Sequence, residues 1–131
     1  MNPQTLQVIQ STFDASNQGQ IHFGQVIAQL ISVGVESYHV DYRSGRTTYY
    51  LPDGTTLDLF FNRPAQNIPQ AFNTQAVRAA IVAAQQGLVM YPEFVPLTQQ
   101  AGCIGYTVWI QGRHVNYLGH CGEMHTEHFP D

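Results

Sequence analysis

The chain has 131 residues, of which 44% are hydrophobic, and its formal net charge is -4. This length suits one domain with its own core, and no apolar run approaches the roughly 18 residues that a membrane span needs. The 5 basic residues are all arginines, which disfavours a nucleic-acid partner and excludes chemistry that needs a lysine, such as a Schiff base or a Walker A phosphate loop.

The first part of the chain predicts two helices. Residues 1–10 lack the positive and apolar segments of a secretory signal, so we expect a cytoplasmic protein with no membrane partner. One stripe at helical spacing is formed by Val8, Ile9, Thr12, Phe13 and Ser16. It predicts a helix that ends at Gly19, and a second helix is expected to begin near Phe23 and to end at Gly34.

Three strands are predicted to follow these helices. Residues 38–42 alternate between the apolar Tyr38, Val40 and Tyr42 and the polar His39 and Asp41. Such alternation is typical of a strand that buries one face. Turns at residues 43–45 and 52–54 predict two further strands, over 46–51 and 55–61.

The same succession begins again after residues 62–72. That segment, NRPAQNIPQAF, contains two prolines and no clear period, so it is predicted to be a linker. Asn73 has the side chain of an N-cap residue for a helix over 74–86, and Gly87 is expected to end that helix.

A shorter helix and three more strands are predicted in the rest of the chain. The helix spans Pro92–Ala101 and ends at Gly102, and Pro96 is expected to shorten or kink it because proline removes a backbone donor. The strands are predicted over 106–110, 113–118 and 123–129, with turns at 111–112 and 119–122.

The two halves therefore have the same organisation. A displacement of 68 positions aligns residues 17–42 with residues 85–110, and a one-residue slip then aligns residues 46–51 with residues 113–118. We expect an internal duplication of a helix–helix–three-stranded meander unit, with repeat one at 1–61, the linker at 62–72 and repeat two at 73–131. Since neither meander would bury its apolar face alone, both are expected to share one core in a single α+β domain over 1–131. Whether they join into one sheet or pack as two is left open.

Several stretches resemble a known bacterial family. They are YHVDYRSGRTTYY (38–50), AAIVAAQQG (79–87), and NYLG followed by MHTEHFP (116–130). This pattern resembles the YbcV-like family of unknown function, whose members often carry the label "phage envelope protein". The resemblance implies a small α+β protein of bacterial or prophage origin with no established reaction, cofactor or catalytic residue.

The last predicted strand carries the densest group of reactive side chains. Residues 119–128 read GHCGEMHTEH. Because side chains alternate between the faces of a strand, Glu123, His125 and Glu127 are expected on one face and His128 on the other. The imidazoles of His125 and His128 are then unable to share one metal ion.

The turns predict which residues lie opposite each other in the second meander. If the turn at 119–122 has four residues, the pairs are Leu118 with Glu123, Asn116 with His125, and His114 with Glu127. The turn at 111–112 sets Trp109 opposite His114. The outer face of this meander is then expected to carry Trp109, His114, Asn116, Glu123, His125 and Glu127.

These six residues have three interpretations. In the first they are the polar surface of an ordinary solvated sheet. In the second they form a binding surface for a protein partner or a second copy of the chain, without a cofactor. In the third the histidines and glutamates act together, either with His114, His125 and Glu127 as ligands of a divalent metal in a metal-binding protein or metal-dependent enzyme, or as a general acid–base set. No HExxH helix, nucleophile elbow or glycine-rich phosphate loop supports an enzyme. The leading functional hypothesis is therefore a non-enzymatic binding or interaction protein with no catalytic residue, and the metal site is the alternative.

Other reactive residues carry weaker signals. His39 and Asp41 are expected to be exposed side by side, and His22 is expected at a partly buried boundary before the second helix. Cys103 and Cys121 form no C-x-x-C pair and are expected to be reduced thiols.

Overall fold

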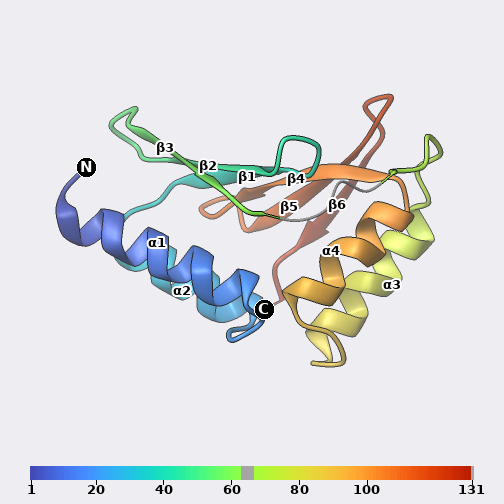
Figure 1. Cartoon of the computed structure of the whole chain (residues 1–131), viewed down its shortest axis with the longest axis horizontal. Coiled ribbons are helices and arrows are strands. Elements are labelled where there is room, and N and C mark those ends of the chain that lie inside the picture. Colours follow the sequence, from blue (N-terminus) through green and yellow to red (C-terminus); the bar gives the residue numbers. More distant parts are fainter. Residues whose placement is uncertain (63–66, 131) are drawn as a thin grey trace.

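The computed structural model of the chain describes residues 1–62 and 67–130 (Figure 1). Its helices are α1 (Pro3–Asn17), α2 (Phe23–Ser32), α3 (Thr74–Gln85) and α4 (Tyr91–Gln100). Its strands are β1 (Ser37–Asp41), β2 (Arg46–Tyr50), β3 (Thr56–Phe60), β4 (Cys103–Trp109), β5 (His114–Gly119) and β6 (Met124–His128). The mixed α+β class is confirmed, with four helices and a six-stranded antiparallel sheet in the described residues.

The six strands form one sheet in the order β3-β2-β1-β4-β5-β6. Antiparallel pairing of β1 with β4 at the centre joins the two meanders, which answers the question that the sequence leaves open. Helices α1 and α2 form one hairpin and α3 and α4 form another, and both lie against the same face of the sheet (Figure 1). None of the four described helices lies on the opposite face, which we call the open face (Figure 1).

The two meanders pair their strands in the same register. Thr48 pairs with Asp58 in the first, and Asn116 pairs with Thr126 in the second. Each β1–β2 and β2–β3 pair has a counterpart 68 positions further along the chain. His39 pairs with the residue that lies 68 positions after it, and the β1–β4 ladder is symmetric about this pair.

The one-residue slip predicted between the halves is wrong. The loops after β1 and β4 both have four residues, 42–45 and 110–113, so Arg113 occupies the position of Gly45. Both residues have a left-handed backbone, with φ of 72° for Gly45 and 58° for Arg113. The sequence suggested a deletion because a left-handed position normally indicates glycine, and here an arginine adopts it.

Side chains at the helix starts explain where the helices begin. Asn73 accepts a hydrogen bond from the Ala76 N–H at 3.0 Å, which confirms the predicted N-cap. The Gln25 side chain accepts from the His22 N–H in α2, and Glu93 accepts from the N–H of Met90 in α4. Helix α4 continues through Pro96 and is 10 residues long, the same length as α2, so the predicted shortening does not occur.

The core lies between the helices and the covered face of the sheet. The largest fully buried aliphatic side chains are Ile9, Leu30, Val40, Val77, Val95 and Val108. Burying one such side chain contributes about 1.5–3 kcal/mol. Tyr38, Val40 and Tyr42 are buried on the covered face, and His39 and Asp41 lie on the open face, as their alternation predicts. Both are half-buried, however, rather than exposed as expected. Among the described helices, none is long and apolar enough to cross a membrane.

Candidate binding site

The hairpin that contains β6 has a different register from the predicted one. The observed pairs are Leu118 with Met124, Tyr117 with His125, and Val115 with Glu127. The Gly119 N–H donates to the Glu123 carbonyl at 2.8 Å, so the loop has three residues rather than four. Gly122 closes this loop with a φ of 81°, as glycine does in three-residue hairpins. The predicted facing pairs are therefore wrong by one residue.

This shift divides the six predicted surface residues between the two faces of the sheet. Segment 124–128 is extended, so His125 and His128 point to opposite sides, as expected. Trp109 pairs with His114, also as predicted, and these two lie with Asn116 on the open face. The strand partners of His125 and Glu127 are the buried Tyr117 and Val115, so Glu123, His125 and Glu127 lie on the helix-covered side.

The metal alternative is not favoured by this arrangement. Its ligands would be His114, His125 and Glu127, but His114 lies on the open face and the other two lie on the covered side. No group of three or more His, Cys, Asp or Glu side chains that suits a metal ion occurs in residues 1–62 and 67–130. The Glu123 carboxylate has a structural contact, because it accepts a hydrogen bond from the Cys121 N–H at 2.8 Å.

Polar side chains form a row across the middle of the open face. In strand order the row is Asp58, Thr48, His39, Thr107, Asn116 and Thr126. Within it, Thr48 donates to Asp58 at 2.6 Å, His39 bonds Thr107 at 2.8 Å, and Thr126 donates to Asn116 at 3.0 Å. Large apolar side chains lie exposed on either side of the row, and they are Tyr50, Phe60, Trp109 and Met124.

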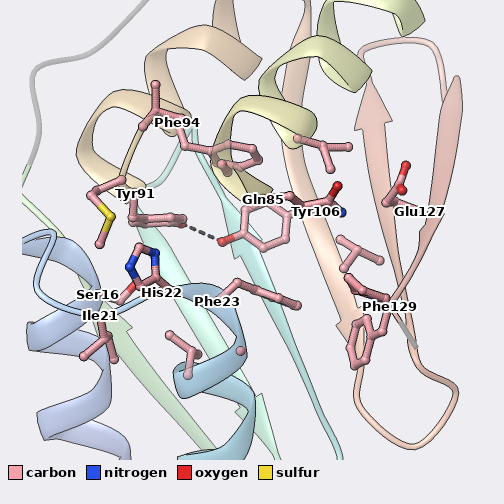
Figure 2. Close-up of a pocket in the computed structure, with 18 of the residues that line it drawn as sticks. Ser16, Ile21, His22, Phe23, Gln85, Tyr91, Phe94, Tyr106, Glu127 and Phe129 are labelled. Atoms are coloured by element: carbon pink, nitrogen blue, oxygen red, sulfur yellow. Dashed lines mark hydrogen bonds between the residues drawn. The ribbon is translucent and has the colours of Figure 1, made fainter. Parts of the chain in front are cut away.

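The covered side contains a cavity of about 540 Å³ between the two helical hairpins and the sheet (Figure 2). Its floor includes Tyr38, Tyr106 and Tyr117 from three neighbouring strands, β1, β4 and β5. Its walls come from the beginning of α2, the end of α3, the beginning of α4 and the end of β6. The cavity was not predicted from the sequence, because it depends on how two hairpins distant in sequence pack on one sheet.

Aromatic rings make up much of the cavity surface. The hydroxyls of Tyr91 and Tyr106 share a hydrogen bond of 2.7 Å, which the close-up shows inside the cavity (Figure 2). Tyr106 and Tyr117 have ring centroids 5.5 Å apart. Phe23 meets Phe129 edge-to-face at 5.4 Å, at the more exposed end, where Phe23 is 43% exposed. Burial raises the pKa of Tyr106 well above its ordinary value, so this hydroxyl stays neutral.

A polar pair lies beside these rings. His125 Nε2 is 3.0 Å from Glu127 Oε1, and the His125 ring stacks on Tyr117 with centroids 6.4 Å apart. Glu127 lines the cavity from β6 (Figure 2). The same register positions in β3 hold Leu57 and Leu59. The sequence reveals this change of polarity between the halves, but the error in the turn assigned it to the wrong face.

The remaining reactive residues differ in exposure. Cys103 is buried, and burial raises the pKa of its thiol to about 11, whereas Cys121 is exposed, and both are free thiols. His22 is exposed rather than partly buried, and it lies at the cavity as the residue before α2. His39 bonds Thr107 rather than Asp41, whose carboxylate bonds Arg43 at 3.1 Å.

Comparison with known proteins gives a family. The family described as "Protein of unknown function (DUF1398)" matches residues 5–128. No curated protein matches the sequence.

Proposed function

Because the chain belongs to the DUF1398 family, whose description assigns no activity, we propose its function from the geometry of the cavity. The protein binds a small, largely apolar molecule with an aromatic or other planar ring, between the two helical hairpins and the covered face of the sheet. The observation that carries this proposal is a cavity of about 540 Å³ lined by aromatic rings.

The size and lining of the cavity support this function. Small-molecule sites in proteins occupy about 300–1,000 Å³ and combine an apolar lining with a few polar groups. Here the rings of Tyr38, Phe94, Tyr106 and Tyr117 are buried and face a hollow that contains few polar side chains. A planar ring is the shape that stacks best on such walls.

The leading hypothesis from the sequence is also a non-enzymatic binding protein, but it expects a protein partner or a second copy on the outer face of the second meander rather than a small molecule in a cavity. The metal-dependent alternative is not favoured, since its three ligands are divided between two faces. A YbcV-like relationship, a bacterial or prophage origin and a cytoplasmic location stay predictions. The internal duplication also stays a prediction, which the shared strand register supports, and a half-length relative that forms a two-fold dimer would establish it.

A neutral fluorescent dye tests the binding function. N-phenylnaphthylamine emits strongly only in apolar surroundings, and we expect saturable binding of one dye per chain. Dye at 100 times its dissociation constant should stabilise the protein by about 2.7 kcal/mol, which a thermal melt detects. Titration fluorescence and melting temperature are the two measurements.

Two phenylalanine variants of α3 locate the bound dye. Ala84 lines the cavity, whereas Ala79 lies exposed on the same helix. Ala84→Phe should fill the cavity and weaken dye binding by about tenfold or more, a loss of at least about 1.4 kcal/mol, while Ala79→Phe should bind like the wild type. Equal binding by both variants, or fluorescence that never saturates, would reject the cavity as the site.

A further inference from the structure

We infer that the cavity selects ligands that carry a cationic nitrogen, such as a protonated amine attached to the ring, through the carboxylate of Glu127. This inference rests on the proposed function and specifies the class of its ligand. Three features support it. The cavity lining carries a negative charge, the pair His125 and Glu127 occupies positions that hold leucines in β3, and aromatic rings line the cavity.

The charge of the cavity lining is negative. Among the described residues that line it, Glu127 is the only one with a formal charge at neutral pH, and no arginine is present. The Glu127 side chain is only partly buried, with 33% of its surface exposed. An anionic ligand that bound with its carboxylate near Glu127 would be repelled by this like charge, so the lining disfavours anions.

The polar pair is placed where packing alone would favour apolar residues. The register positions of His125 and Glu127 hold Leu57 and Leu59 in β3. A carboxylate on the covered side of a sheet is destabilising unless it is hydrogen-bonded. His125 contacts one carboxylate oxygen at 3.0 Å, and in the described part of the chain this is the only hydrogen bond of the Glu127 side chain. The second oxygen thus has the capacity to accept from a ligand.

The aromatic rings favour the same class of ligand. A cation near the face of an aromatic ring is stabilised by the negative charge density of that face. Tyr106 and Tyr117 line the cavity together with Glu127, whereas the Phe129 ring already has the guanidinium of Arg113 5.5 Å from its centroid. A protonated amine bound beside Glu127 is therefore attracted both by the carboxylate and by the neighbouring rings, while the apolar part of the ligand occupies the remaining space.

Three ligands with the same ring and different charges test this selectivity. They are naphthylmethylamine (cationic), naphthalenemethanol (neutral) and naphthoate (anionic), measured by calorimetry and by displacement of N-phenylnaphthylamine. At about pH 8 the amine carries a positive charge, and a glutamate carboxylate in water is ionised. We expect the amine to bind about tenfold more tightly than the alcohol, and the carboxylate to bind least well.

Matched variants assign the selectivity to one carboxylate. Glu127→Gln should remove the preference for the amine and leave binding of the alcohol unchanged. Glu36→Gln removes the same charge from an exposed residue that does not line the cavity, and it should keep the preference. The double variant His125→Leu with Glu127→Leu introduces the residue type of β3 and should fold, bind the alcohol and show no preference for the amine.

The outcomes separate the inference from the function beneath it. If the alcohol binds and Ala84→Phe weakens it, but the amine binds no better, the selectivity inference is overturned and the binding function stands. The same holds if Glu127→Gln and the leucine double variant both keep the preference. If none of the three ligands displaces the dye or shifts the melting temperature, the proposed function itself fails.

Discussion

His39 couples the stability of the fold to pH because of its position at the centre of the sheet. Burial lowers the pKa of this imidazole, the negative charge of Asp41 opposes that effect, and Arg46 and Arg43 reinforce it. A lowered pKa means that the folded state disfavours the protonated form. The unfolded chain then binds more protons between the folded-state pKa and the ordinary value of about 6.5.

The free energy of unfolding should consequently fall as the pH is lowered from 7 through this interval. His39→Gln should reduce that fall, because glutamine does not titrate, and urea unfolding at pH values between 5 and 7 measures it. Thr56→Gln, at an exposed position on β3, introduces the same side chain without removing a titratable group, so it is the control and should keep the wild-type dependence. An unchanged pH dependence in His39→Gln would contradict this account.

The sequence predicted which residue types belong to the candidate site better than it predicted the face of the sheet on which they lie. The sequence identifies His125 and Glu127 as a departure from the apolar residues of the first half. Their face depends on whether the loop before them has three or four residues, and one residue reverses every side chain of a strand. Gly122 contained the signal, because a left-handed glycine at the end of the loop is typical of the three-residue hairpin.

At the scale of single elements, the ends of two corresponding helices predict different tolerance to substitution. Gly34 follows α2 with a φ of 79° and has open space around it. Gly102 follows α4 with a φ of 88°, and an added Cβ would lie 2.1 Å from the Ala71 carbonyl oxygen. Gly34→Ala should cost about 1–2 kcal/mol for the left-handed backbone alone, whereas Gly102→Ala should exceed about 3 kcal/mol because backbone must move.

Denaturant unfolding of both variants checks this difference, with Gly24→Ala as a control. Gly24 lies within α2, and its Cβ would contact nothing within 4 Å, so alanine there should be neutral or stabilising. Equal losses for Gly34→Ala and Gly102→Ala would show that the contact at Ala71 has no effect on stability.

Helix ends were predictable because glycine leaves a local signal. Gly19, Gly34, Gly87 and Gly102 were all expected to end helices, and all four have positive φ. The left-handed Arg113 was not predictable, because an arginine carries no such preference. Its side chain instead has tertiary contacts, since it donates to the Pro130 carbonyl at 3.2 Å and lies 5.5 Å from the Phe129 ring centroid.

For the whole molecule, the placement of the four described helices on one side of the sheet creates two separate surfaces (Figure 1). The cavity belongs to the covered side, and the exposed Trp109, which is 42% exposed, belongs to the open face with His114 and Asn116. The interaction surface predicted from the sequence is thereby reduced to these three residues. Its role in contacting a protein partner or a second copy stays a prediction.

Sedimentation velocity over a range of protein concentrations tests self-association through the open face. We expect the wild type to sediment faster as concentration rises, and Trp109→Ala to remove this dependence with a change in unfolding free energy of only about 1 kcal/mol. Val82→Ala truncates a similarly exposed side chain on α3 and should associate like the wild type. Identical behaviour of all three proteins would remove self-association through Trp109 from consideration.

The shared sheet was only partly predictable at this scale. Each meander follows from local alternation and turns, but the pairing of β1 with β4 joins segments that are far apart in sequence and has no local signal. Each meander must bury one face, and this predicts that the two meanders share a core. The same requirement is met by one continuous sheet and by two sheets packed together, so it does not distinguish between them.

The central His39–Thr107 pair has a consequence for how such a molecule can become asymmetric. In a dimer of two identical half-length chains around a two-fold axis, every substitution would occur twice. A glutamate introduced beside the cavity in one chain would therefore also replace the leucine that packs at the same position of the other chain. In a continuous polypeptide the two halves can differ: Leu59 packs in the first half, while the matching position in the second half holds Glu127, the residue proposed to recognise a cation.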